Sequence, residues 1–325
     1  MSYEQEKTIA IEAALAAAKL CEQVRHEIVP EAIEKKDRSP VTVADFGSQA
    51  LICRVLAEAF PDDSIVGEED AAELRQPDMA ARLQQVTQYV QALVPDATSD
   101  QVMTWIDRGN GEVGSRYWTL DPIDGTKGFL RGDQYAVALA LVEAGEIKVG
   151  VLACPALSFS NNGQAAPDTG LLFVAVRGQG ATMVPINGGE PKPIQVASLD
   201  AQASLRFVQS VETGHGDHTR QEAIAKAVGI ANAPLCMDSQ AKYGAVAAGQ
   251  AALYLRLPSP KSPDYREKIW DHAAGVIVVE EAGGQVTDMH GKPLDFSKGA
   301  KLVENQGVIV SNGPIHETVL GVLNQ

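Results

Sequence analysis

Two carboxylates three residues apart, Asp121 and Asp124, stand in the middle of residues 118–129. Pro122 restricts one φ angle, and the Asp-Gly pair that follows favours a turn. Both carboxylates and the intervening carbonyl of Ile123 are therefore able to converge on one hard cation, which prefers oxygen ligands. An ordinary Asp-Gly turn without a ligand needs the same residues, so this stretch by itself leaves both interpretations open.

The next two residues, Gly125 and Thr126, extend this stretch toward anion binding. If Thr126 opens a helical turn, the first backbone N–H groups of that turn point toward an anion, which would place a phosphate beside the metal. The alternative is that Thr126 is a plain N-cap, because a hydroxyl caps a helix well without any ligand.

Further acids stand where elements are expected to begin or end. Asp45 lies three residues after Thr42, the spacing of a capping box, so a structural role is as plausible there as a chemical one. Asp271 opens a helical run, where the macrodipole favours an acid by about 0.3–1 kcal/mol. Glu68 and Glu69 follow a short strand, and a solvated loop would explain them equally well. The hypothesis of a metal site therefore rests on these acids as a set.

The periodicity of the apolar residues predicts the elements that must hold these side chains. Helical spacing is found in segments 11–28, 44–60, 71–93, 219–228, 241–248, 271–282 and 314–323. Strand-length apolar runs are found at 64–66, 118–120, 135–142, 147–153, 171–176, 205–211, 252–257 and 307–310. The runs 135–142, 147–153 and 171–176 predict an antiparallel meander, whereas the alternation of strands and helices beyond residue 198 predicts a mostly parallel sheet.

The length of 325 residues suggests two domains at roughly 150 residues each. We expect an N-terminal α+β domain over residues 1–198 and a C-terminal α/β domain over residues 199–325. The composition, 45% hydrophobic and 21% charged, is typical of a folded chain. The four cysteines are scattered without a CxxC pair, which predicts buried thiols and leaves a regulatory disulfide open.

The net charge of −15 disfavours binding to nucleic acids and to anionic membranes. The longest aliphatic run, residues 136–142, is far shorter than the ~20 residues that span a bilayer. Residues 1–7 are polar and lack the apolar core of a signal peptide. We therefore expect a cytoplasmic protein that acts on a small molecule, with no nucleic-acid or membrane partner and with protein partners unknown.

Together, these acids and the anion-binding turn resemble a known family. Residues 67–69, 121–126 and 270–275 look like the three motifs of the lithium-sensitive, magnesium-dependent phosphatase superfamily that includes the inositol monophosphatases. Within it, residues 36–45, 238–243 and 265–271 resemble the 3'(2'),5'-bisphosphate nucleotidases. The resemblance covers nearly the whole chain and implies a layered αβαβα sandwich with the metals at the junction of the two domains.

The resemblance also implies an activity and a metal site. The activity is hydrolysis of the 3'-phosphate of adenosine 3',5'-bisphosphate, a by-product of sulfur metabolism, to AMP and phosphate. Whether 3'-phosphoadenylyl sulfate is also a substrate stays open. Two to three magnesium ions are implied, with Asp121 bridging two of them. The implied metal ligands are Glu68, Asp121, the carbonyl of Ile123, Asp124 and Asp271.

The same resemblance assigns catalytic and substrate-binding residues. Asp45 would be the general base and the hydroxyl of Thr126 its proton relay. For the nucleotide, Arg offers a planar fork and Lys a mobile point charge to a phosphate that does not react. The implied substrate-binding residues are Gly125, Thr126, His215, Ser239, Lys242 and Arg256.

Three other functions compete with this one. An inositol phosphate phosphatase would use the same metal site and is the main alternative. A haloacid-dehalogenase-type phosphatase would need Asp-x-Asp-Gly-Thr near the start of the chain, whereas this chain has Asp-x-x-Asp-Gly-Thr beginning at Asp121. A nucleotide sensor without turnover is disfavoured because every position that matches a catalytic residue is intact. A substrate panel with and without magnesium separates these possibilities.

Overall fold

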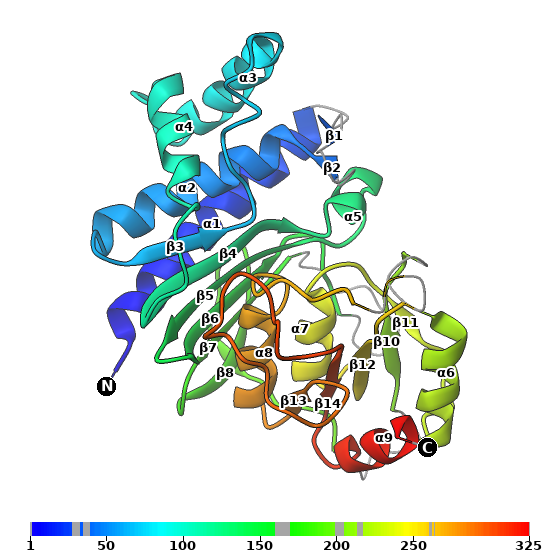
Figure 1. Cartoon of the computed structure of the whole chain (residues 1–325). Helices are drawn as coiled ribbons and strands as arrows, with labels where there is room; N and C mark the ends of the chain where they lie inside the picture. Colours follow the sequence, from blue (N-terminus) through cyan, green and yellow to red (C-terminus); the bar gives the residue numbers. More distant parts are fainter. Residues whose placement is uncertain are drawn as a thin grey trace.

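The computed structural model describes residues 2–27, 33–34, 40–159, 170–198, 205–212, 217–259, 262 and 264–324. Two β-sheets and their helices form alternating layers (Figure 1). Three buried hydrophobic clusters fill the spaces between these layers. The layered α/β class expected from the sequence is therefore confirmed. None of the helices in these ranges combines the length and the apolar character needed to cross a bilayer.

The outer layer on the N-terminal side is a pair of helices, α1 (Glu4–Glu27) and α2 (Val43–Ala59). The buried face of α1 is dominated by alanines, which lets α1 pack closely against α2 and the first sheet. Helix α2 begins at a capping box in which Thr42 and Asp45 satisfy each other's backbone groups. The predicted segment 44–60 matches α2 within one residue, whereas α1 begins seven residues before the predicted segment 11–28.

The first sheet has seven strands that follow one another in chain order. Its first pair, β3 and β4, is parallel and the other pairs are antiparallel, so the predicted meander is confirmed. The pairing of β4 with β5 shifts between Asp121 and Asp124, which marks a bulge at the end of β4. The strands are β3 (Ser64–Gly67), β4 (Arg116–Asp124), β5 (Ala136–Glu143), β6 (Glu146–Cys154), β7 (Leu171–Val176), β8 (Gly180–Pro185) and β9 (Lys192–Pro193).

Smaller elements flank this sheet. The predicted helix over 71–93 is shorter, because only α3 (Ala80–Gln91), preceded by a 3-10 turn η1 (Pro77–Met79), is helical there. Helix α4 (Ser99–Asp107) was not predicted, although Thr98 and Gln101 form its capping box. A two-stranded ribbon, β1 (Ile33–Glu34) with β2 (Pro40–Val41), and the short helix α5 (Thr126–Arg131) complete the N-terminal half.

The second sheet has the strand order β11-β10-β12-β14-β13. Four strands run in one direction, but β14 runs against them between β12 and β13, so half of the pairings are antiparallel. The prediction of a mostly parallel sheet thus holds for strand direction and is wrong for the pairing. The reason is the return from β13 to β14, which uses a loop in place of a crossover helix. The strands are β10 (Phe207–Gln209), β11 (Leu235–Cys236), β12 (Leu253–Arg256), β13 (Gln285–Thr287) and β14 (Val308–Ser311).

Helices cover both faces of this second sheet (Figure 1). Helices α7 (Ala241–Ala247) and α8 (Ala273–Glu281) lie between the two sheets, and α6 (His218–Ala227) and α9 (His316–Leu323) form the outer layer. The first sheet ends at Pro193 and the second begins at Phe207. The domain limits 1–198 and 199–325 stay a prediction, and residues 199–204 lie outside the described part of the chain.

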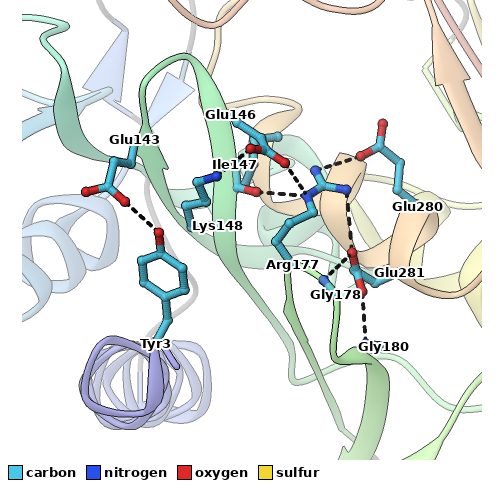
Figure 2. A network of polar contacts seen from close by, with 10 residues as sticks. All are labelled: Tyr3, Glu143, Glu146, Ile147, Lys148, Arg177, Gly178, Gly180, Glu280 and Glu281. Atoms are coloured by element: carbon cyan, nitrogen blue, oxygen red, sulfur yellow. Dashed lines mark hydrogen bonds and ion pairs between the residues drawn. The ribbon is translucent and has the colours of Figure 1, made fainter. Parts of the chain in front are cut away.

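The C-terminal end of α8 is tied to the first sheet by a polar network (Figure 2). The carboxylate of Glu281 accepts backbone N–H groups of Gly178 and Gly180, both at 2.9 Å, in the turn between β7 and β8. Arg177 in the same turn pairs with Glu280 at 2.8 Å. These contacts fix α8 between the sheets, and the residues just before this helix reach the candidate site.

Candidate active site

The Asp-x-x-Asp stretch forms the carboxyl end of β4, and Gly125 makes the turn that follows it. Asp121 is 2% exposed and accepts the backbone N–H of Ile123 at 3.0 Å. Gly125 has φ +85, a left-handed conformation that residues with a Cβ rarely adopt, and this turn lets α5 begin at Thr126. The bulge and the left-handed glycine together aim Asp121 and Asp124 to one side of the sheet edge.

The four motif carboxylates share one cavity of about 330 Å³. Strands β3 and β4 are parallel, with Gly67 paired to Leu120. The residues that follow this pair along the chain, Glu68 and Asp121, therefore lie at the same edge of the sheet. Asp271 reaches the cavity from just before α8 in the other half of the chain. A hydrolase site would require these acids to meet in space, and the structure brings Glu68, Asp121, Asp124 and Asp271 together.

The proximity of these acids is electrostatically costly. Burial raises the pKa of the Asp121 carboxyl, and Glu68, Asp124 and Asp271 raise it further. Burial likewise raises the pKa of Asp271, against the opposing charge of Arg256. Hard oxygen donors that repel one another in one cavity are the donor set that a divalent cation neutralises. The arrangement therefore fits a divalent metal site to which the carbonyl of Ile123, also in the cavity lining, can contribute.

Asp45 shows that the capping role and the contact with the candidate site are compatible. Its Oδ2 atom accepts the backbone N–H and the hydroxyl of Thr42 at 2.8 and 2.7 Å, which completes the capping box. Its Oδ1 atom lies 3.3 Å from the hydroxyl of Thr126, which is also 3.2 Å from the carbonyl oxygen of Ile123. The cap thus holds the fully buried carboxylate of Asp45 with its second oxygen directed at Thr126, two residues after Asp124.

Cationic side chains line the same cavity. Burial lowers the pKa of Lys242 to about 8, although Asp124 opposes this shift, and the ammonium lies 5.3 Å from the ring centroid of Tyr254. Arg256, the last residue of β12, lies in the same lining. Ser239 also contributes, whereas His215 lies outside the described residues. The cavity therefore combines carboxylates suited to cations with cationic side chains suited to an anion.

Gln240 is a site residue that the sequence analysis missed. Its backbone N–H donates to Oδ2 of Asp124 at 2.7 Å. Its side chain donates to the carbonyl oxygen of Trp270 at 2.9 Å and accepts the backbone N–H of Gly275 at 3.0 Å. Gln240 thereby joins the second and third motifs. The available signal was its place beside Ser239, in a stretch that already resembled the nucleotidases.

Glu267 is a second missed residue, and it holds Arg256. Its Oε2 atom lies 2.8 Å from Nε of Arg256 and 3.2 Å from Nε2 of His272. Burial would raise the pKa of Glu267, but the charge of Arg256 and the contacts of His272 outweigh it and lower this pKa to about 2. The sequence gives no periodicity signal for this pairing, because both residues stand in or next to irregular segments.

Comparison with known proteins identifies the family of this site. The model of the inositol monophosphatase family matches residues 2–325. A 3'(2'),5'-bisphosphate nucleotidase of Schizosaccharomyces pombe is 43% identical, with 98% of this chain and 95% of the relative covered. The 3'(2'),5'-bisphosphate nucleotidase 1 of Arabidopsis thaliana is 44% identical over 96% of this chain and 93% of its own.

Solved structures share the fold at lower identity. An inositol monophosphatase of Thermotoga maritima superposes with a TM-score of 0.64 at 23% identity, covering 98% of this chain and 97% of its own. CysQ from Bacteroides thetaiotaomicron gives a TM-score of 0.59 at 21% identity, with coverages of 95% and 97%. The family model and the nucleotidase relatives confirm the resemblance inferred from the three motifs, and the solved structures confirm the layered fold. The chain belongs to the inositol monophosphatase family.

Proposed function

We propose that this protein is a magnesium-dependent phosphatase that removes the 3'-phosphate of adenosine 3',5'-bisphosphate, giving AMP and phosphate. The observation that carries the proposal is a single cavity whose lining combines the four motif carboxylates with Lys242 and Arg256. Such a cavity suits one phosphate beside metal ions and a second phosphate on fixed cations. Nucleotidase relatives at 43–44% identity support this choice of substrate. 3'-Phosphoadenylyl sulfate carries the same 3'-phosphate and is a further candidate.

The carboxylates would hold two to three magnesium ions. Glu68, Asp121 and the carbonyl oxygen of Ile123 would form one site, and Asp121, Asp124 and Asp271 a second. When bound, these ions supply Lewis-acid polarisation of the phosphoryl group and lower the pKa of a bound water. The mutual repulsion that raises the pKa of Asp121 supports this assignment, because bound cations would relieve it.

Asp45 and Thr126 would manage the proton of the attacking water. The hydroxyl of Thr126 has one proton and lies 3.3 Å from Oδ1 of Asp45, so it can accept the proton of the water while passing its own to the carboxylate. The capping contacts of Thr42 hold the other oxygen of Asp45 in place. The helix cap therefore orients the carboxylate in advance, so no conformational entropy has to be lost to orient it when the reaction occurs.

The substrate would lie between the two halves of the chain. Gly125 and Thr126 would contact the reacting phosphate, since both line the cavity next to the acids. Lys242 and Arg256 would bind the phosphate that does not react, with Ser239 beside them. His215 would contact the nucleoside, as the resemblance implies. Cytoplasmic location and the absence of a nucleic-acid partner stay predictions from composition and charge.

Phosphate release from three substrates tests this function. Adenosine 3',5'-bisphosphate, inositol 1-phosphate and inositol 1,4-bisphosphate are each incubated with the enzyme, with and without magnesium. We expect turnover of the nucleotide to exceed that of both inositol phosphates, and to be lost in excess chelator. Preferential hydrolysis of an inositol phosphate would refute the substrate assignment while leaving the metal site standing. Full activity without divalent cations would refute the metal assignment.

A further inference from the structure

A chain of polar contacts links Tyr243, which lines the cavity, through His272 and Glu267 to Arg256. The hydroxyl of Tyr243 lies 2.7 Å from Nδ1 of His272, and Nε2 of His272 lies 3.2 Å from Oε2 of Glu267. The same carboxylate oxygen lies 2.8 Å from Nε of Arg256. Tyr243 and His272 are each 1% exposed and Glu267 is 8% exposed. Both ring nitrogens of His272 and Oε2 of Glu267 have polar partners, so these buried side chains have few alternative conformations.

The backbone around Glu267 is held as well. Its carbonyl oxygen accepts the N–H of Leu302 at 2.9 Å, and the N–H of Ile269 donates to the carbonyl oxygen of Ala300 at 3.2 Å. Glu267 therefore presents its carboxylate from an anchored segment although it belongs to no helix or strand. Arg256 has a long side chain with high rotamer entropy, so an anchored partner is what keeps its guanidinium in one place.

Metal binding is the competing interpretation of this cluster. Glu267, Asp271 and His272 each offer one ligand atom, and these atoms lie within 4.8 Å of one another. However, Nε of Arg256 already lies 2.8 Å from Oε2 of Glu267, and this permanent positive charge would repel a metal ion bound to the same oxygen. His272 also has both nitrogens in contacts with protein groups. The cluster is thus better suited to holding an arginine than to holding a metal.

We propose that Glu267 is a positioning residue that fixes the guanidinium of Arg256 toward the cavity and thereby sets the preference for a substrate with a second phosphate. This inference rests on the proposed function only for the identity of that phosphate. His272 contacts Glu267 and is itself held by Tyr243. Because His272 directly follows Asp271, these contacts tie the position of the arginine to that of the third motif. Glu267 touches neither substrate nor metal in this scheme and acts through Arg256.

A double-mutant cycle with two substrates tests the proposal. In Glu267→Gln we expect KM for adenosine 3',5'-bisphosphate to rise about tenfold and kcat to stay within about twofold. For adenosine 3'-monophosphate, which lacks the second phosphate, we expect KM to change by less than about twofold. In an Arg256→Met background, adding Glu267→Gln should leave KM for the bisphosphate unchanged, because the two residues act as one unit. Equal changes for both substrates, or additive effects in the cycle, would overturn the proposal.

A matched control is available at the far end of α8. Glu281 is also an acid paired with an arginine, with Oε1 at 3.5 Å from Nη1 of Arg177, but it does not line the cavity. Glu281→Gln makes the same chemical change and should leave KM for both substrates unchanged. A rise in KM for the bisphosphate in this control equal to that in Glu267→Gln would show a general effect of destabilisation and overturn the assignment.

A measurement without substrate separates this inference from the proposed function. In protein with 15N-labelled arginine, the Nε–H signal of Arg256 is identified by its absence from Arg256→Met. We expect it to persist at neutral pH in the wild type and to be lost through solvent exchange in Glu267→Gln. If the wild type fails to hydrolyse the bisphosphate, the proposed function falls and this signal still decides the positioning role. An unchanged signal in Glu267→Gln would overturn it.

Discussion

Gly275→Ala is the most informative single test of how the third motif packs. Gly275 lies in the first turn of α8, and a Cβ atom there would lie 2.3 Å from Cγ of Tyr243. Ordinary carbon contacts lie at about 3.5–4.0 Å, so the overlap exceeds 1 Å with a fully buried ring. Overpacking of this kind costs up to about 3 kcal/mol, and alanine returns about 1 kcal/mol through its helix propensity. We expect a net loss of about 2 kcal/mol in the free energy of unfolding.

The same displacement should reduce activity. Tyr243 would have to move, and its hydroxyl holds His272, the residue next to Asp271. The assay is urea unfolding followed by circular dichroism, with kcat and KM measured on the same samples.

Gly321→Ala in α9 is the control for the test at Gly275. Apart from its chain neighbours and the backbone of its own helix, no atom of the described residues lies within 4 Å of a Cβ built at Gly321. We therefore expect a gain of about 0.5 kcal/mol from helix propensity and unchanged kinetics. A Gly275→Ala protein as stable as Gly321→Ala would refute the argument that the third motif needs a glycine for packing.

Three further changes probe other parts of the molecule. Asp121→Asn should lower kcat by roughly 1000-fold or more, and an active variant would contradict the metal assignment. In metal-free buffer the same change should raise the melting temperature, because it removes a charge that the neighbouring acids repel. It should also abolish the increase in melting temperature that magnesium gives the wild type. Because the pKa of Lys242 is about 8, kcat/KM for the bisphosphate should fall as pH rises through about 8 and the ammonium loses its charge, and Lys242→Arg should move this fall to higher pH. Glu281→Gln weakens charge-assisted hydrogen bonds to Gly178 and Gly180, so the urea midpoint should drop by the equivalent of about 1–2 kcal/mol with kinetics unchanged.

Sequence alone determined the helices, strands and turns, because these form through interactions between residues close together in the chain. The spacing of apolar residues predicted α2 within one residue and the antiparallel strands β5 to β7. The Asp-Gly pair predicted the turn after β4, which the left-handed Gly125 makes. Each of these features arises from steric preferences or from burial of one face, and both act over a few residues. The three acidic motifs were also visible, because they stand at the ends of such elements.

Only the tertiary structure decided which distant groups meet. The parallel register of β3 and β4 places Glu68 beside Asp121, and the pairing of Gln240 with Asp124 spans 116 residues. Likewise, the sequence did not reveal that β14 reverses direction or that Glu267 holds Arg256. These contacts follow from how whole layers pack and how loops return, and the residues involved have no short-range preference for one another. Local pattern therefore specifies the elements and their ends, whereas packing between elements specifies the geometry of the site.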